Sequence, residues 1–145
     1  MKAFIIIVAA TVSFAFSALD SNLKIAGTVV NAGLSPQKSV MVVMMTEDGD
    51  FIQSTKTNRN GQFVIELDYD MVVDLEFRLE GYKPKMIRVN THGVPEDEQA
   101  IGFEFSGFKV ELVEGDVSSD PIVSGVIHYD PMMGFFDAVK TDPGE

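Results

Sequence analysis

Apolar and polar residues alternate over short runs in this chain, and turn residues separate the runs. The clearest run is VDLEFRLE over residues 73–80, where Val73, Leu75, Phe77 and Leu79 occupy every second position. Successive side chains of a strand point to opposite faces, so this run predicts a strand with those four residues directed inward. The intervening residues, which we expect to face water, are Asp74, Glu76, Arg78 and Glu80.

The other β-prone runs are LKIAGTVV (23–30), SVMVVMM (39–45), FIQSTKT (51–57), QFVIEL (62–67), MIRVN (86–90), FEFSGFKVELVE (103–114) and PIVSGVIHYD (121–130). Short strands at this spacing predict an all-β sandwich. We expect about seven strands from Leu23 to Asn90 and two more in the C-terminal part. One helical turn is expected near Pro95. The residues predicted to be buried are Ile25, Val29, Phe63, Ile65, Leu75 and Phe77.

The polar stretch TNRNG, residues 57–61, lies between two of these runs. Asn60-Gly61 is a strong signal for a tight turn, because both residues tolerate positive φ. The stretch predicts strand, turn and strand, with Asn58 and Asn60 capping the turn through their own side chains. A binding loop is the alternative interpretation.

The N-terminal segment has the composition of a secretory signal peptide. Lys2 precedes an apolar run over residues 3–16, and Ala15 and Ser17 are suitably small for a cleavage site. We therefore expect residues 1–17 to be removed near Ser17–Ala18, with export to the periplasm, the outer cell surface or the medium. An uncleaved anchor is the alternative, although the run is shorter than the about 20 residues that span a bilayer. No later stretch is apolar enough to span one.

Cysteine is absent, so neither disulfides nor a lipid-bearing cysteine are available to the chain. The net charge is −11, and it is unevenly distributed. Residues 18–93 carry ten acidic and eight basic residues, whereas residues 94–145 carry twelve acidic and two basic residues. This balance argues against nucleic acid and disfavours anionic lipid surfaces. It leaves a basic partner or a divalent cation open, and it also serves solubility.

The sequence resembles the carboxypeptidase regulatory-like domains, which have a transthyretin-like (prealbumin-like) β-sandwich. Thr57-Asn58-x-Asn60-Gly61-x-Phe63 resembles their T-D-x-x-G-x-F signature, with Asn58 in place of the usual Asp. KIAGTVVNAG resembles their first strand, SVMVVMM falls where a V-x-V-x-L strand is found, and LEGYKPKMIRV resembles the closing G-Y segment. The bend before the second strand is reduced to LSPQKS.

This resemblance covers about half of the expected mature chain, and it implies a folding, docking or spacer module without catalysis. Residues 18–93 would form the sandwich, and residues 94–145 an acidic β extension packed on it. The C-terminal part resembles small exported proteins of Bacteroidota with a Y-D-x-x-x-G-x-F-D element, matched by Tyr129, Asp130, Gly134, Phe136 and Asp137.

Catalytic chemistry has little support in the sequence. His92 and His128 are the two histidines, and neither lies in a zinc-binding pattern. The acidic turns at 47–50, 68–70 and 114–120 could supply oxygen ligands for calcium, but none matches a calcium-binding loop, and solvated turns are the competing interpretation. No catalytic residue, metal ligand or cofactor is therefore predicted.

YDPMMGFFDA, residues 129–138, concentrates Met132, Met133, Phe135 and Phe136. If these side chains stay exposed they form an interaction patch, whereas if they fold back they close one edge of the sandwich, which we favour. We expect a non-catalytic exported module for protein binding or envelope assembly. The alternative is a small calcium- or zinc-dependent enzyme or a ligand-binding protein.

Overall fold

The computed structural model describes residues 22–140 and is almost entirely β-structure. In chain order the strands are β1 (Leu23–Val30), β2 (Met41–Thr46), β3 (Phe51–Lys56), β4 (Gln62–Leu67), β5 (Val72–Arg78), β6 (Lys85–Asn90), β7 (Phe103–Glu111), β8 (Ile122–Asp130) and β9 (Phe135–Lys140). The described residues include one short helix, α2 (Glu96–Gln99). The predicted signal peptide, residues 1–17, lies outside the described part.

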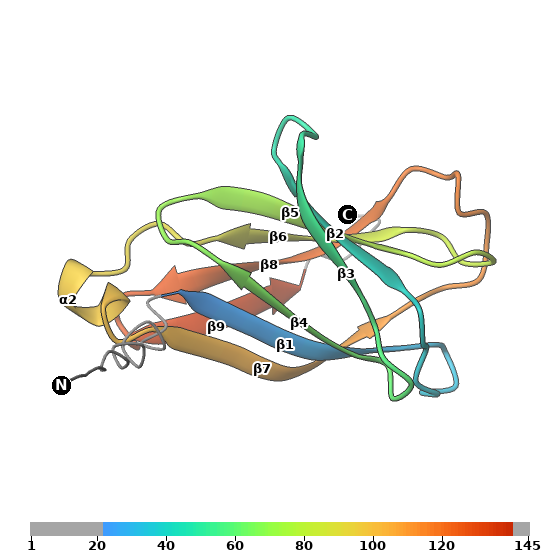
Figure 1. The fold of residues 1–145 in the computed structure, drawn as a ribbon, viewed down its shortest axis with the longest axis horizontal. Coiled ribbons are helices and arrows are strands. Elements are labelled where there is room, and N and C mark those ends of the chain that lie inside the picture. The colour runs from blue at the N-terminus through green and yellow to red at the C-terminus, as the bar shows by residue number, and fades with distance from the viewer. Residues whose placement is uncertain (1–21, 141–145) are drawn as a thin grey trace, which may run out of the picture.

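Two sheets pack face to face to form a β-sandwich (Figure 1). The smaller sheet has the strand order β4-β1-β7, and the larger has the order β3-β2-β5-β6-β8-β9. Neighbours are antiparallel except for the parallel pairs β1–β7 and β6–β8. The predicted all-β sandwich is thus confirmed, and no helix among residues 22–140 is long and apolar enough to cross a bilayer.

The core lies between the two sheets. All six residues that the alternation predicts to be inward are buried there: Ile25, Val29, Phe63, Ile65, Leu75 and Phe77. Phe63 of β4 and Phe77 of β5 meet edge to face across the core, with ring centroids 5.3 Å apart. This geometry suits the quadrupoles of two aromatic rings, so the pair joins the sheets at the centre of the sandwich.

The distribution of strands differs from the prediction. Six strands, not about seven, lie between Leu23 and Asn90, and three rather than two follow. The additional C-terminal strand is β9, whose sequence FFDAVK does not alternate and whose side chains are all exposed except that of Phe136. It is a strand because it pairs along its whole length with β8.

The C-terminal strands belong to both sheets. β7 lies beside β1 in the smaller sheet, whereas β8 and β9 continue the larger sheet beyond β6. Val110, Leu112, Ile127 and Phe136 contribute to the same core as the residues of β1 to β6. β1 and β7 are parallel neighbours, and parallel neighbours need a long crossover connection. Here the chain between β1 and β7 passes through the larger sheet before it returns to pair with β1.

One prediction from the sequence is wrong: the outward face of β5 is not exposed to water at Asp74 and Glu76. Asp74 and Glu76, predicted to face water, have exposed fractions of only 4% and 7%. β5 lies in the interior of the larger sheet, so its outward side chains are flanked by those of β2 and β6. Arg88 donates to both carboxylate oxygens of Asp74, at 2.8 and 3.1 Å, and Arg78 lies 2.6 Å from Glu76. The carboxylates are therefore buried but paired, as buried charges must be.

Candidate interaction surface

The Asn58–Gly61 stretch is a turn whose polar groups are used within the fold. The side-chain oxygen of Asn58 accepts hydrogen bonds from the backbone N–H groups of Asn60 and Gln62, each at 2.9 Å. Gly61 has a φ of +74°, in the left-handed region that glycine adopts without strain. The capping role predicted for Asn58 is present, and its side-chain oxygen is occupied by the turn itself. The capping predicted for the Asn60 side chain is not found, because Asn60 takes part through its backbone N–H.

Thr57, which begins this stretch, has a structural role that the sequence did not reveal. Its hydroxyl donates to the carbonyl of Gln37 at 2.7 Å and accepts from the N–H of Val40 at 2.9 Å. The side chain is buried, and its bond to Val40 forms away from water. Thr57 thereby fixes the segment that leads into β2. In the sequence, the only indication of this role is a threonine placed just before a turn.

The two histidines lie apart from any cluster of candidate ligands. His92 is exposed in the loop after β6, and His128 lies on the outward side of β8 between the buried Ile127 and Tyr129. Within residues 22–140, no three side chains of His, Asp or Glu lie close enough together to hold a metal ion.

The acidic turns form local hydrogen bonds and one ion pair. Asp116 accepts from the backbone N–H of Ser118 at 2.9 Å and from its hydroxyl at 2.8 Å, and these bonds lower the pKa of the Asp116 carboxyl. Glu47, in the β2–β3 turn, lies 3.6 Å from Arg88. Both carboxylates thus have partners of the kind expected in polar turns.

An open depression of about 600 Å³ lies on the outer face of the smaller sheet. Small side chains line it, including Ala26, Thr28 and Ser106, and Lys56 is its ionisable residue. A second hollow, of about 230 Å³, has Lys24 between Glu66 and Glu104.

The predicted patch of Met132, Met133, Phe135 and Phe136 is divided by the fold. Met132, Met133 and Phe135 have exposed fractions of 93%, 62% and 45%, whereas Phe136 is 5% exposed. Phe136 lies against Phe103, with ring centroids 5.5 Å apart, and closes the core. The favoured prediction, that these side chains fold back and close one edge of the sandwich, therefore holds for Phe136 only. Phe136 is not part of an exposed patch, whereas the other three side chains remain on the surface.

The turn that carries these exposed residues is held by Asp130. The Asp130 carboxylate accepts from the N–H of Met132 at 2.9 Å, and its backbone carbonyl accepts from the N–H of Gly134 at 2.8 Å. Gly134 adopts a φ of +74°, which allows the chain to reverse into β9. The two methionines are thus presented by a hydrogen-bonded turn.

Ile101, which the sequence did not single out, is 80% exposed in the segment between α2 and β7. This segment adjoins the β8–β9 turn at the α2 end of the sandwich (Figure 1). The hydroxyl of Tyr129 donates to Glu98 of α2 at 2.6 Å, and this bond, with burial and nearby carboxylates, raises the pKa of Tyr129 to about 12. We call Met132, Met133 and Phe135 the apolar end patch.

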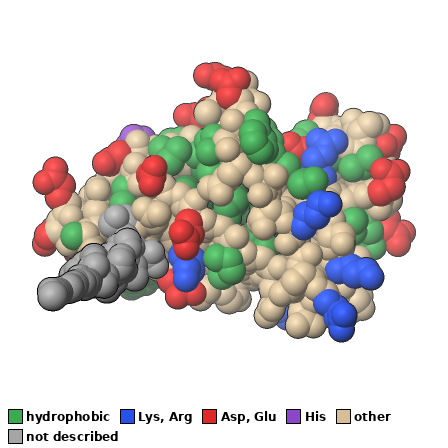
Figure 2. Space-filling model, in the orientation of Figure 1, with side chains coloured by type: hydrophobic (Ala, Val, Ile, Leu, Met, Phe, Trp, Pro, Cys, Tyr) green, Lys and Arg blue, Asp and Glu red, His purple; other side chains and the backbone are tan. Residues whose placement is uncertain are grey.

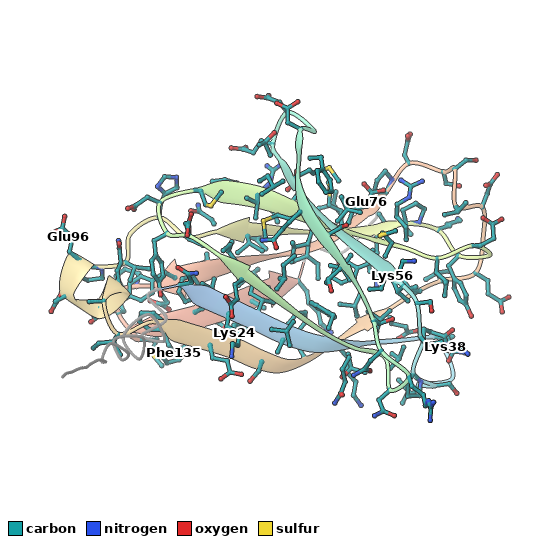
Figure 3. All side chains as sticks on the ribbon, viewed as in Figure 1. Lys24, Lys38, Lys56, Glu76, Glu96 and Phe135 are labelled. Carbon is teal, nitrogen blue, oxygen red and sulfur yellow. The ribbon has the colours of Figure 1, made fainter. Side chains whose placement is uncertain are left out.

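Carboxylates surround this end of the molecule. Glu96, Asp97 and Glu98 lie in α2, and Asp130 begins the β8–β9 turn. Figure 3 shows Glu96 and Phe135 at this end, with Lys38 and Lys56 at the other. On the face drawn in Figure 2, most Lys and Arg side chains gather away from α2, and one lies nearer to it between acidic side chains. The apolar end patch therefore lies in an acidic part of the surface.

Comparison with known proteins identifies neither a matching family model nor a curated relative. Similar solved structures include 3-chlorocatechol 1,2-dioxygenase from Rhodococcus opacus (14% identity, TM-score 0.45, covering 65% of this chain and 60% of the enzyme). Catechol 1,2-dioxygenase from an Acinetobacter species has 13% identity, a TM-score of 0.46 and coverage of 70% and 58%. A dioxygenase domain from a Streptomyces species has 13% identity, a TM-score of 0.48 and coverage of 65% and 80%.

The chain thus spans about 60% of the length of the first two enzymes. Because neither a family model nor a curated relative matches, the resemblance to carboxypeptidase regulatory-like domains remains a prediction from the sequence motifs.

Proposed function

We propose that this protein is a non-catalytic, exported β-sandwich module that binds another protein of the cell envelope through its apolar end patch. The observation that carries the proposal is the exposure of Met132, Met133 and Phe135 on a hydrogen-bonded turn. Single exposed apolar residues are common on protein surfaces. Here three occur within four positions of the chain.

The chemistry of the patch favours a protein as its partner. Methionine and phenylalanine are side chains that protein interfaces use often, and unbranched methionine adapts to the shape that it meets. The carboxylates of α2 and Asp130 would repel nucleic acid and anionic lipid headgroups. Export rests on the predicted signal peptide, and N-terminal sequencing of the exported protein should give a chain that begins at Ala18.

A photo-crosslinking amino acid at Met133, introduced in the producing cells, tests the binding site. We expect a covalent adduct with a specific envelope protein, which disappears when Met132 and Phe135 are both replaced by serine. The same crosslinker at Val64, an exposed valine of β4, is the control and should give no such adduct. No adduct from position 133, or the same adducts from both positions, would contradict the proposed site.

The non-catalytic part of the proposal has a separate test. Activity profiling of the purified mature protein against hydrolase substrates should detect no turnover. An activity that is lost in the His92→Ala, His128→Ala double variant would instead support the metal-dependent alternative.

A further inference from the structure

On one side of the sandwich, β7 and β9 are the edge strands of their sheets, and Phe103 of β7 packs against Phe136 of β9 between them. On the opposite side, β3 and β4 follow each other in the chain, and the side-chain amide of Gln53 donates to the carbonyl of Glu66 at 2.8 Å. This bond links the two edges on that side. Among residues 22–140, no strand pairs with the second side of β9.

The two open edges differ in how well they are protected against another strand. The register of β7 shifts opposite Ala26 and Gly27, and Gly107 at the irregularity has a φ of +81°. Such bulges distort an edge and hinder the addition of a strand. β9 contains no proline, and its register with β8 is continuous from Phe135 to Lys140. It is therefore the regular edge of the two.

The outward face of β9 has a definite chemical pattern. Phe136 and Ala138 pair with the inward residues Tyr129 and Ile127, so Phe135, Asp137 and Val139 lie on the outward face. Phe135 is 45% exposed and Val139 is 52% exposed. The Asp137 carboxylate is exposed and accepts a hydrogen bond from the backbone N–H of Ala138 at 2.9 Å. The face thus presents an apolar, an acidic and an apolar residue at alternate positions of a strand that is paired on one side.

We propose that β9 accepts an extended segment of the partner protein as a seventh strand of the larger sheet, and that this segment carries an apolar, a basic and an apolar residue at alternate positions. Backbone hydrogen bonds would hold the added strand, and side chains at alternate positions would select it. Its basic residue would lie opposite Asp137, and its apolar residues opposite Phe135 and Val139. This inference rests on the proposed function, because Phe135 also belongs to the apolar end patch.

A second copy of this chain fits the β9 edge less well. In an antiparallel pair, side chains directly opposite each other lie on the same face. The register that places Phe135 opposite Val139 of a second copy also places the two Asp137 carboxylates opposite each other. Like charges in that position are destabilising. The net charge of −11 on each chain further opposes self-association.

Two peptides test the proposal on the mature protein. The first is Thr-Val-Thr-Arg-Thr-Val-Thr, and the second has Glu in place of Arg. Binding is followed by fluorescence anisotropy, and amide hydrogen exchange locates it. We expect the Arg peptide to slow exchange in β9, and the Glu peptide to bind at least about fivefold more weakly because it places a carboxylate opposite Asp137.

Two lysine variants separate the β9 edge from other exposed apolar positions. Val139→Lys should weaken binding of the Arg peptide by about fivefold or more, because an apolar pair is lost and a positive charge is added beside the peptide's Arg. Val64→Lys is the matched control, since Val64 is also 52% exposed but lies in the smaller sheet, and it should leave binding unchanged.

The proposal is overturned if the Arg peptide gives no protection of β9 amides, if both peptides bind equally, or if only Val64→Lys reduces binding. A stable dimer that is lost in Val139→Lys would also overturn it in favour of a second copy. These outcomes are distinct from failure of the proposed function. A specific adduct from position 133 together with no strand addition at β9 would retain the binding site and reject the binding mode.

Discussion

Replacing Gly61 with alanine tests whether this glycine is required by its surroundings as well as by its backbone angle. Gly61 has a φ of +74° in the turn between β3 and β4. A non-glycine residue in the left-handed region loses about 1–2 kcal/mol, and about 0.4–1 kcal/mol of this is offset by the lower entropy of the unfolded chain. The backbone angle alone therefore accounts for a loss of about 1 kcal/mol.

The neighbours of Gly61 add a second contribution. A Cβ atom on Gly61 would lie 2.6 Å from the carbonyl oxygen of Val29 and 3.0 Å from the amide nitrogen of Gln37. These two backbone atoms share a hydrogen bond of 2.9 Å, and the N–H of Val29 donates to the carbonyl of Gly61 at 2.8 Å. Because backbone groups must move, one or two of these bonds weaken, at about 0.5–1.5 kcal/mol each. We expect Gly61→Ala to lower the free energy of unfolding by about 1.5–4 kcal/mol in total.

Gly49→Ala is the matched control for this prediction. Gly49 has a φ of +90° in the β2–β3 turn, and a Cβ there would have no atom within 4 Å. Its loss should therefore come from the backbone angle alone and remain near 1 kcal/mol. Equilibrium urea unfolding followed by far-ultraviolet circular dichroism measures both variants. If Gly61→Ala loses no more stability than Gly49→Ala, crowding against Val29 and Gln37 is not important.

Three further predictions concern the core, the C-terminal strands and one tyrosine. Phe63→Ala and Phe77→Ala should each lower the free energy of unfolding in urea by about 3–5 kcal/mol, and a loss under about 1 kcal/mol for both would refute the assigned inward face. Truncation after Gly93 removes β7, the parallel neighbour of β1, together with β8 and β9. The shortened chain should melt earlier or aggregate; a monomer that melts like the mature chain would show that residues 94–145 are dispensable for folding. The pKa of Tyr129 is raised to about 12, so its hydrogen bond to Glu98 stabilises the fold below the unfolded pKa of about 10, and this contribution is lost as the pH rises to about 12. The absorbance of tyrosinate should show a step near pH 12 that is missing in the Tyr129→Phe variant. If the variant keeps this step, the raised pKa does not belong to Tyr129.

Much of the fold follows from local sequence. Alternation placed Phe63, Ile65, Leu75 and Phe77 in the core, and Asn60-Gly61 located the turn between β3 and β4. These features could be predicted because strand periodicity and turn conformation depend on neighbouring residues. The resemblance to carboxypeptidase regulatory-like domains drew on the same local motifs.

Strand order decided features that local sequence could not. Asp74 and Glu76 alternate with core residues as solvent-facing residues do, yet they are buried because β5 lies inside a six-stranded sheet. β9 has no alternating pattern, and its pairing with β8 makes it a strand. Burial on an outward sheet face depends on which strands lie alongside, and sequence distant along the chain supplies those strands.

The candidate site shows the same division. The sequence determined that Met132, Met133, Phe135 and Phe136 form an apolar cluster near a turn, because composition and turn residues are local. Tertiary structure decided that Phe136 faces the core opposite Tyr129 while Phe135 faces outward. It also brought α2 to the same end of the sandwich as the β8–β9 turn and left one side of β9 without a neighbouring strand in the described part of the chain. Adjacent residues of a strand point to opposite faces, and only long-range packing determines which face becomes the core.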